Sequence, residues 1–400
     1  MTPKTKMEYS KIVAKRYLLA KNRKEKGKIL DEFAATLKYH RKSAIRKLNT
    51  INFKDPTNQR KGREKLYSGE ADTLLVQIWQ SYGCVCGERL HPFISEGMAI
   101  LEHLGYIEEP DSVKKEVLSM SMGTVKRRIS SRQQRFGKGK GLSATKPGSL
   151  LKKQIPIRTG NWDENKPGYC EIDLVAHCGG SLLGNLIYTL QFVDIKTTWT
   201  ERNAVIGKGQ EGVFKGIKKI EKQLPFDLLG LDSDNGSEFI NDQLWKYCDE
   251  NKIYFTRSRP YMKKDNAHIE QKNWPLVRKI LGYDRFDTQE QLDLINGLYD
   301  NELRLFINFF QPTMKLKEKI RVGSKYKRKY DTARTPYRRV LECPEVSEEK
   351  KDELKKLYAT LDPIKLKKGI DEKVARIIKL GDVSRQQRTS DGALDEKYED

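Results

Sequence analysis

The chain has 400 residues, which is enough for two to four domains with cores of their own. It contains 77 Lys and Arg residues against 55 Asp and Glu residues, and the resulting formal net charge of +22 favours a polyanionic partner such as nucleic acid. No apolar run approaches the ~20 residues of a membrane span, and the first residues lack the apolar core of a secretory signal. We therefore expect no membrane partner and a cytoplasmic location.

Residues 1–68 form the first predicted module, with 20 Lys and Arg residues against 6 Asp and Glu residues. Apolar residues recur at helical spacing within 9–17, 29–37 and 44–48. Three short helices with a basic third one are typical of a helix-turn-helix module, whose last helix can enter the major groove. A small helical bundle with a solvated basic face is the alternative. The candidate DNA contacts on the third helix are Arg41, Lys42, Arg46 and Lys47.

A second helical module is predicted at residues 69–135, because apolar residues again recur at helical spacing. Its last two helices, near 111–118 and 124–129, repeat the helix-turn-helix layout and place Lys126 and Arg127 on the outer side. Two such modules in tandem would read an extended DNA site. Residues 136–154 have the Gly, Ser and Lys content of a flexible linker.

The predicted core, residues 155–312, has the pattern of an α/β domain. Strands are predicted at 169–177, 186–194, 198–206, 228–233 and 253–257. A helix is predicted after each of the last three strands, the last one at 269–281. This order of elements is that of an RNase H-like core, in which the first and fourth strands are neighbours.

Three carboxylates of this core are the candidate catalytic residues and metal ligands. Asp173 lies within the first strand, Asp234 ends the fourth, and Glu270 lies in the first turn of the last helix, with 35 residues between Asp234 and Glu270. Magnesium prefers oxygen ligands, and two such ions can act together on one phosphodiester. The pattern therefore predicts two Mg²⁺ or Mn²⁺ ions per site.

Other residues near these carboxylates leave alternatives open. Glu171 shares a strand face with Asp173, and Asp232 shares one with Asp234, because side chains alternate along a strand. We prefer Asp173 and Asp234 by motif position. Trp274, one turn beyond Glu270, is predicted to lie in the core. The loop before that helix contributes two candidate DNA contacts, Lys263 and Lys264.

The predicted carboxyl-terminal region, residues 313–380, is basic and mainly helical, with helices at 348–358 and 370–380. Residues 325–330 interleave basic and aromatic side chains, a combination that suits DNA-backbone binding and base stacking. A solvated charge run is the alternative. Residues 381–400 are predicted to be a disordered tail. The candidate DNA contacts in this region are Lys325, Lys327, Arg328 and Lys329.

The segment 161–337 resembles the integrase-type catalytic core of DDE transposases, which include bacterial insertion-sequence transposases and retroviral integrases. The stretches that carry the resemblance are Glu171–His177, Ser233–Phe239 and Asp265–Lys272. The resemblance implies metal-dependent cleavage and transfer of DNA strands at the three carboxylates. It also implies a homo-oligomer on the ends of a mobile element, insertion into double-stranded target DNA, and association with the nucleoid.

The sequence departs from the family pattern in two places. Two alternative functions also stay open. The amino-terminal part lacks the His/Cys zinc module of retroviral integrases, so the helical modules fit the bacterial branch better. Pro275 lies inside the helix that carries Glu270, where a proline costs ~3 kcal/mol in a regular helix and predicts a kink. A catalytically inactive DNA-binding regulator of transposition and an RNase H-like nuclease are the alternative functions.

Overall fold

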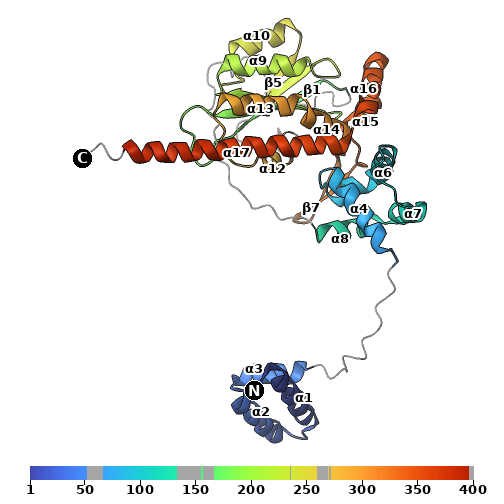
Figure 1. The fold of residues 1–400 in the computed structure, drawn as a ribbon, viewed down its shortest axis with the longest axis vertical. Helices are drawn as coiled ribbons and strands as arrows, with labels where there is room; N and C mark the ends of the chain where they lie inside the picture. Colours follow the sequence, from blue (N-terminus) through green and yellow to red (C-terminus); the bar gives the residue numbers. More distant parts are fainter. Residues whose placement is uncertain are drawn as a thin grey trace. The chain divides into compact units, whose positions relative to one another are not determined.

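The structure, a computed structural model, describes residues 1–51, 66–132, 155, 166–234, 236–258, 269 and 272–395, with 382–395 described as backbone only. It divides into two compact units, Met1–Leu66 and Tyr67–Asp400. Figure 1 labels their helices and strands along the chain. Among the described residues, no helix has both the length and the apolar character that crossing a membrane requires.

The described part of the first unit contains three helices at the predicted positions: α1 (Pro3–Leu19), α2 (Arg23–Leu37) and α3 (Arg41–Thr50). Phe33 is buried in their shared core together with Val13 and Leu48. A short turn separates α2 from α3. In it, Lys38 caps α2 in the left-handed conformation, and His40 caps α3 through its side chain. The unit has the three helices and the short turn of the predicted module, while its binding to DNA remains a prediction.

Short helices open the second unit. They are α4 (Gly69–Ser81), α5 (Gly87–Leu90), η2 (His91–Phe93), α6 (Ile94–His103), α7 (Asp111–Ser119) and α8 (Met122–Ser130). Tyr82, at the end of α4, packs on Phe310 with ring centroids 6.3 Å apart. Glu96 of α6 accepts hydrogen bonds from Arg338 at 2.7 Å and Tyr358 at 2.9 Å. These helices are therefore packed directly against elements that follow the sheet, and the predicted linker lies outside the described residues.

A mixed sheet of five strands forms the centre of the second unit, in the order β3-β2-β1-β4-β5. The strands are β1 (Tyr169–Ala176), β2 (Ile187–Asp194), β3 (Thr200–Ile206), β4 (Gly230–Ser233) and β5 (Tyr254–Arg257). The pairs β1–β2 and β2–β3 are antiparallel, and the pairs β1–β4 and β4–β5 are parallel. Parallel pairs need crossover connections, which contain α9 (Gln210–Glu221) and α10 (Asp242–Glu250). The first and fourth strands are neighbours, as predicted from the order of elements along the chain.

The outer edge of β3 is covered by the two helices α13 (Gln289–Asp300) and α14 (Glu302–Phe310). Asn296 of α13 accepts from the backbone nitrogen of Ala204 at 2.8 Å and donates to its carbonyl at 3.0 Å. Asn308 of α14 pairs in the same way with a second backbone site on β3. Backbone groups at a sheet edge need such partners, so this edge is closed, and the acidic strands β1 and β4 lie inside the sheet.

The helix predicted at 269–281 departs from regular geometry at Pro275. Residues Trp274–Arg278 form a π-helical turn, η3, which is followed by α12 (Lys279–Leu281). Proline cannot donate the hydrogen bond of a regular helix, and π turns are one cause of helix kinks. The irregularity expected at Pro275 is thus present as a widened turn. Gly282 ends the helix with a φ of +74°.

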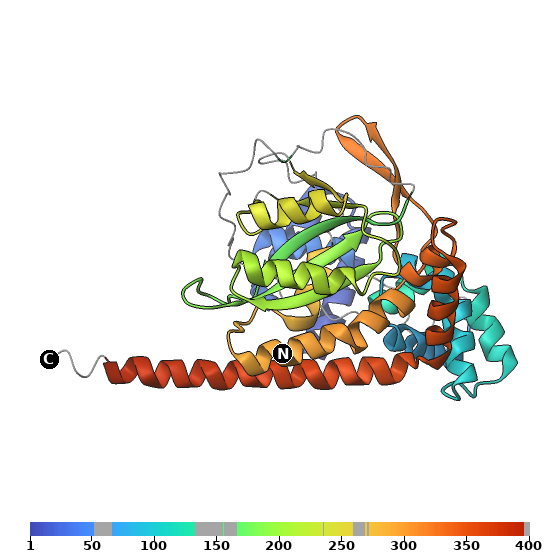
Figure 2. The same ribbon diagram turned by 90° about the horizontal axis from the view of Figure 1, so that it is seen from above.

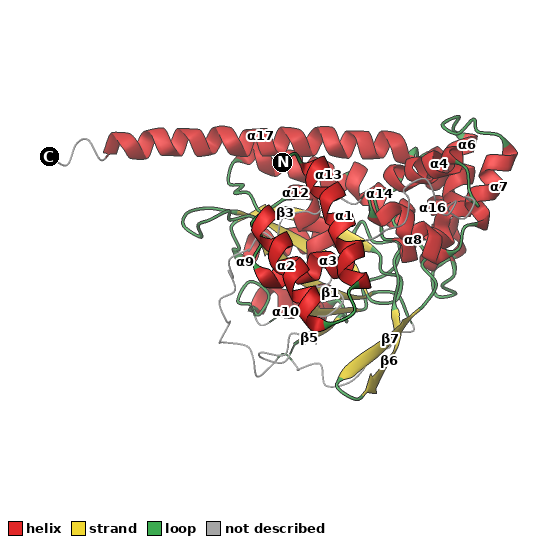
Figure 3. Cartoon of the chain, turned by 90° about the horizontal axis from the view of Figure 1, so that it is seen from below, coloured by secondary structure: helices red, strands yellow, loops and turns green. Residues whose placement is uncertain are grey.

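The carboxyl-terminal region differs from the prediction in two places. First, it contains a hairpin, β6 (Leu316–Val322) and β7 (Lys325–Tyr330), which projects from the second unit (Figure 2, Figure 3). Helices follow it as α15 (Pro336–Leu341), α16 (Glu348–Thr360) and α17 (Pro363–Asp395). Second, the prediction of a disordered tail from residue 381 is wrong as far as residue 395, because α17 continues to that point.

Candidate active site

Two of the three predicted carboxylates come from neighbouring parallel strands. Asp173 lies on β1 and is half-buried, and Asp234 is the first residue beyond β4. The register of the two strands pairs Glu171 with Asp232. Continued by two residues along each strand, this register brings Asp234 toward Asp173. Asp173 lies on β1 and Asp234 directly follows the strand β4 beside it, while the convergence of their carboxylates on one metal site remains a prediction.

Asp173 is held in place by hydrogen bonds on both of its carboxylate oxygens. The Leu174 backbone nitrogen donates to Oδ1 at 2.8 Å, and the Asn273 amide donates to Oδ2 at 2.6 Å. Asn273 in turn accepts from the Gln191 amide at 3.1 Å, and Gln191 accepts from Arg202 Nε at 3.4 Å. Asp173, Gln191 and Arg202 are opposite one another on three adjacent strands. This polar row fixes the orientation of the Asp173 carboxylate.

Glu171 and Asp232, the alternatives left open by the sequence, are fully buried within the framework of the site. Glu171 accepts from the backbone nitrogen of Ile269 at 2.9 Å. Asp232 accepts from the hydroxyl of its cross-strand partner Thr256 at 2.6 Å. Their burial and these contacts favour a supporting role for both residues. On β1, Asp173 is the more accessible of the two carboxylates. Glu171 attaches the segment around residue 269 to that strand.

Glu270 lies outside the described residues, but residues on both sides of it are described. Ile269 is bonded to Glu171, and Asn273 is bonded to Asp173, so both neighbours contact β1. Asn273 was not predicted from the sequence. In the sequence, only its position three residues after Glu270 points to Asn273, because residues three apart lie on the same side of a helix.

The carboxyl group of Asp234 is electrostatically perturbed. Burial raises its pKa, while a hydrogen bond from the Gly236 nitrogen (2.9 Å) and the charge of Lys208 oppose this rise. Glu238 is a second buried carboxyl group nearby. Burial raises the pKa of Glu238, and the negative charge of Asp234 raises it further. Glu238 was not predicted from the sequence, where its one signal is its place in the stretch Ser233–Phe239.

The two described carboxylates fit a hard divalent cation, which prefers oxygen ligands. A bound cation would favour the ionised form of Asp234 and so oppose the effect of burial on its pKa. Among the described residues, no group of three or more His, Cys, Asp or Glu side chains is arranged to hold a metal ion. Glu270, the predicted third ligand, does not belong to that part of the chain.

The basic residues predicted on α3 differ in their surroundings. Arg41, Lys42 and Arg46 are exposed, and Arg41 also forms an ion pair with an acidic residue of α2. Lys47 is engaged within its own unit, because it donates to the Tyr39 hydroxyl at 2.7 Å. Lys42 and Arg46 are therefore the more accessible of the four predicted contacts on this helix.

The two basic residues predicted on α8 are both exposed. Lys126 forms an ion pair with Glu88 of α5, and this contact raises the pKa of the lysine. Part of its charge is thus already balanced within the protein. Arg127 is the better candidate of the two for a contact with a phosphate.

The remaining predicted contacts lie on β7 and in the loop before the last core helix. Lys325, Lys327, Arg328 and Lys329 are all exposed along β7. Lys263 and Lys264 lie outside the described residues. The more accessible of the predicted DNA contacts in the described part of the chain are therefore Lys42, Arg46, Arg127 and the four basic residues of β7.

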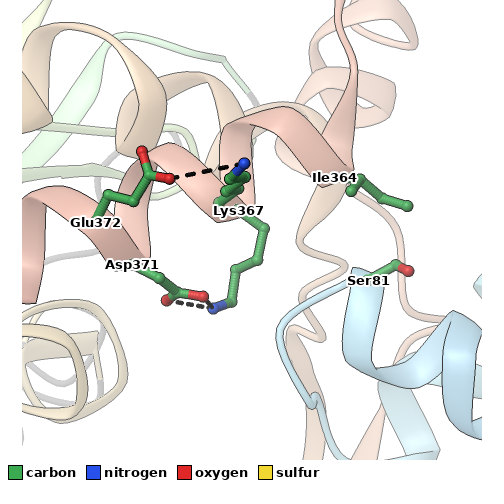
Figure 4. A pocket seen from close by; sticks show the side chains of 6 residues that line it. Ser81, Ile364, Lys367, Asp371 and Glu372 are labelled. Atoms are coloured by element: carbon green, nitrogen blue, oxygen red, sulfur yellow. Dashed lines mark hydrogen bonds and ion pairs between the residues drawn. The ribbon is translucent and has the colours of Figure 1, made fainter.

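A cavity of about 320 Å³ lies between the end of α4 and the start of α17 (Figure 4). Its charged side chains pair with one another along α17, Lys367 with Asp371 and Lys368 with Glu372 (3.9 Å). None of the predicted site residues lines this cavity, so we assign it no role in catalysis. It is lined by Ser81, Ile364, Lys367, Lys368, Asp371 and Glu372.

The strands form a mixed α/β sheet domain in this order, with acidic residues on two adjacent parallel strands, which is the arrangement expected for an RNase H-like core. The uncharacterized protein y4rM of Sinorhizobium fredii (strain NBRC 101917 / NGR234) is 34% identical to this chain over 327 residues. The match covers 82% of this chain and 92% of y4rM. The chain therefore belongs to the same family as y4rM. No protein-family profile matches the sequence.

Solved structures of integrase catalytic cores also match the chain. The HTLV-2 integrase catalytic core domain in complex with magnesium, in its dimeric form, matches 37% of this chain and 90% of that one, at 13% identity and a TM-score of 0.28. The catalytic core domain of BIV integrase matches over 44% and 94%, at 17% identity and a TM-score of 0.30. With scores of this size, the assignment of the fold rests on the strand order and directions.

Proposed function

We propose that this chain is a DDE-type DNA transposase, which cleaves DNA strands at the ends of a mobile element and joins them to target DNA. The observation that carries the proposal is the contact of Asp173 with Asn273, which comes from the segment that contains Glu270. The parallel pairing of β1 with β4 supports it too, because Asp234 directly follows β4. Together with Glu270, these carboxylates would form the oxygen-rich pocket that two-metal phosphoryl transfer uses.

The three carboxylates would have distinct roles. Asp173 would contact two cations, while Asp234 and Glu270 would each contact one. Two bound Mg²⁺ or Mn²⁺ ions would offset the charge of the scissile phosphate and make the attacking oxygen more acidic. The protein's own part is orientation, since the hydrogen bonds from Asn273 and Leu174 hold Asp173 in one position. The attacking group would be water for cleavage and a 3′-hydroxyl for joining.

Double-stranded DNA is the proposed partner, bound by a homo-oligomer of the chain. The net charge of +22 and the exposed basic residues of α3 and β7 support this choice. Each phosphate that a basic side chain neutralises lowers log K by about 0.9 per unit of log salt. Binding should therefore weaken steeply as salt rises, and a flat response would contradict a role for these residues.

The direct test is a strand-transfer assay with the DNA ends that flank the coding sequence, Mg²⁺ and a supercoiled target. Asp173→Asn, Asp234→Asn and Glu270→Gln should each abolish joining while DNA binding is retained. Asp249→Asn, an exposed residue on α10, is the matched control and should behave as the wild type. Wild-type joining by any one of the three variants would remove that residue from the site.

Metal binding can be measured without turnover. Titration with Mn²⁺, followed by electron paramagnetic resonance, should show weaker binding in Asp173→Asn and Asp234→Asn than in the wild type. Metal binding and DNA binding without joining would favour an inactive regulator instead. Cleavage confined to RNA–DNA hybrids would favour a nuclease.

A further inference from the structure

The hairpin β6–β7, called the basic ribbon below, is the most exposed regular element among the described residues of the second unit. Every residue of both strands is exposed. β6 carries three basic residues and one Glu, and β7 carries four basic residues. We propose that the basic ribbon inserts into the major groove of the duplex DNA on which the site acts. This inference rests on the proposed function.

The register of the basic ribbon gives its two faces different chemistry. Arg321 is opposite Tyr326 on one face, and Ile320 is opposite Lys327 on the other. The amino group of Lys319 lies 4.6 Å from the centroid of the Tyr326 ring. Tyr326 is 50% exposed, and large apolar groups such as Ile320 lie beside the cations. Cations suit phosphates, while apolar and aromatic groups suit thymine methyls and base edges.

The root of the basic ribbon is fixed to the rest of the second unit. Asp331 accepts from the Lys315 nitrogen at 2.6 Å and forms an ion pair with Arg339 at 2.8 Å. The hydroxyl groups of Thr313 and Thr198 are 2.7 Å apart. These bonds hold both ends of the hairpin, so its direction is set by the fold.

The same root is connected to the segment that orients Asp173. Lys272, the residue before Asn273, donates to the carbonyl oxygen of Thr198 at 2.8 Å. Thr198 is the residue whose hydroxyl contacts Thr313 at the start of the hairpin. The root of the basic ribbon and the segment that orients Asp173 therefore belong to one hydrogen-bonded network through Thr198.

Size favours the major groove over the minor groove as the binding site. Charge favours duplex DNA over a second copy of the chain as the partner. The major groove is ~12 Å wide and admits a two-stranded ribbon, whereas the minor groove is only ~6 Å wide. A second copy of the chain could pair with an open ribbon edge. The excess of like charge opposes that pairing, because like charges on facing strands repel. Duplex DNA is the occupant that this charge complements.

Cross-linking tests the groove directly. The full chain is irradiated with a mixed-sequence duplex of ~30 base pairs in which 5-iodouracil replaces thymine, so that iodine occupies the methyl position in the major groove. We expect the cross-linked peptide to contain Tyr326, and Tyr326→Ala to lose this cross-link. Tyr254→Ala is the control, since Tyr254 is 54% exposed on β5. Cross-links on other peptides, with none in 316–330, would overturn the inference.

Salt dependence gives a second, independent measure. Changing Lys325, Lys327 and Lys329 to Gln together should reduce the salt slope of duplex binding by up to ~2.7, at ~0.9 for each lost phosphate contact. A triple change of exposed lysines on α16 and α17 should leave the slope unchanged. All ribbon residues are exposed, so thermal unfolding should be the same in every variant. The control lysines are Lys355, Lys356 and Lys365.

The possible outcomes separate the two proposals. Duplex binding by the wild type, with an unchanged slope in the ribbon variant, contradicts the ribbon inference and leaves the proposed function intact. No duplex binding by the wild type contradicts both. A change from oligomer to monomer in the ribbon variant, with DNA binding unchanged, would make the basic ribbon a contact between subunits and overturn the inference.

Discussion

Replacing Asn273 with alanine removes the side chain that donates to Asp173 and accepts from Gln191. The donated bond is 2.6 Å long and ends on a carboxylate. A hydrogen bond to a charged group contributes ~1.5–3 kcal/mol. If all of this contribution is present in the transition state, the rate of strand transfer should fall roughly 10- to 150-fold. The cause would be a mobile Asp173, so binding of duplex DNA should be unchanged.

The assay is single-turnover strand transfer measured over a range of Mg²⁺ concentrations. The Mg²⁺ concentration for half-maximal rate should rise in Asn273→Ala, because the cation would have to order Asp173 itself. Asn273→Asp should be more severe, since it sets a second negative charge beside Asp173. Asn251→Ala, at an exposed Asn that bonds to a carbonyl of α10, is the control. A wild-type rate and a wild-type Mg²⁺ dependence in Asn273→Ala would refute this reasoning.

Three further predictions concern stability and DNA ends. Burial lowers the pKa of His177 to about 3, below its ordinary 6.5. As the pH falls, His177 therefore binds a proton in the unfolded chain but not in the folded one. The free energy of unfolding should decrease by about 2 kcal/mol when the pH is lowered from roughly 7.5 to 5. Urea unfolding at the two pH values measures this loss, which should vanish in His177→Gln. Gly168 has a φ of +103°, and a Cβ there would lie 2.2 Å from the Asp227 carbonyl oxygen. Gly168→Ala should destabilise by ~1–3 kcal/mol in thermal unfolding, whereas Gly212→Ala, with open space around it in α9, should stabilise by up to ~1 kcal/mol. Trp274→Ala should weaken binding to DNA with an unpaired end more than binding to blunt duplex, because the indole is 50% exposed and can stack on a base; equal losses on both DNAs in fluorescence anisotropy would contradict that role.

The sheet could be predicted because burial leaves a strong pattern in sequence. All eight residues of β2 are buried, and a short, mainly apolar and β-branched or aromatic segment bounded by turn residues indicates an interior strand. Asp173 and Asp234 stand out from Glu171 and Asp232 on the same strands by their motif positions. The neighbouring positions of β1 and β4 followed from the order of elements, and the structure confirms them.

Features that depend on contacts distant in sequence could not be predicted. The amide of Asn273 meets Asp173 from 100 residues away, and its own neighbours in sequence do not indicate this contact. Trp274 was predicted to be core, yet the widened turn at Pro275 accompanies a half-exposed indole. The pKa of Glu238 is raised by burial and by the charge of Asp234, and the burial of a single charged residue leaves no pattern in the sequence.

The carboxyl-terminal elements escaped prediction for a different reason. Alternation along a strand is visible when one face is buried and the other is exposed. Neither face of β6 or β7 is buried, so their basic residues indicate no strand. The end of α17 is polar and lacks an apolar stripe, so helical periodicity is absent there although the helix continues to residue 395.

Under the proposed function, the bonds at Glu96 would set a fixed distance along DNA between the helices that open the second unit and its site. Because Arg338 and Tyr358 tie α6 to the last helices, α8 cannot slide relative to the carboxylates without breaking those bonds. A base pair touched by Arg127 would then lie a constant number of steps from the bond cut at Asp173. The packing inside the second unit would then fix the position of the cut. Variants that weaken the bonds at Glu96 would cut at more varied positions.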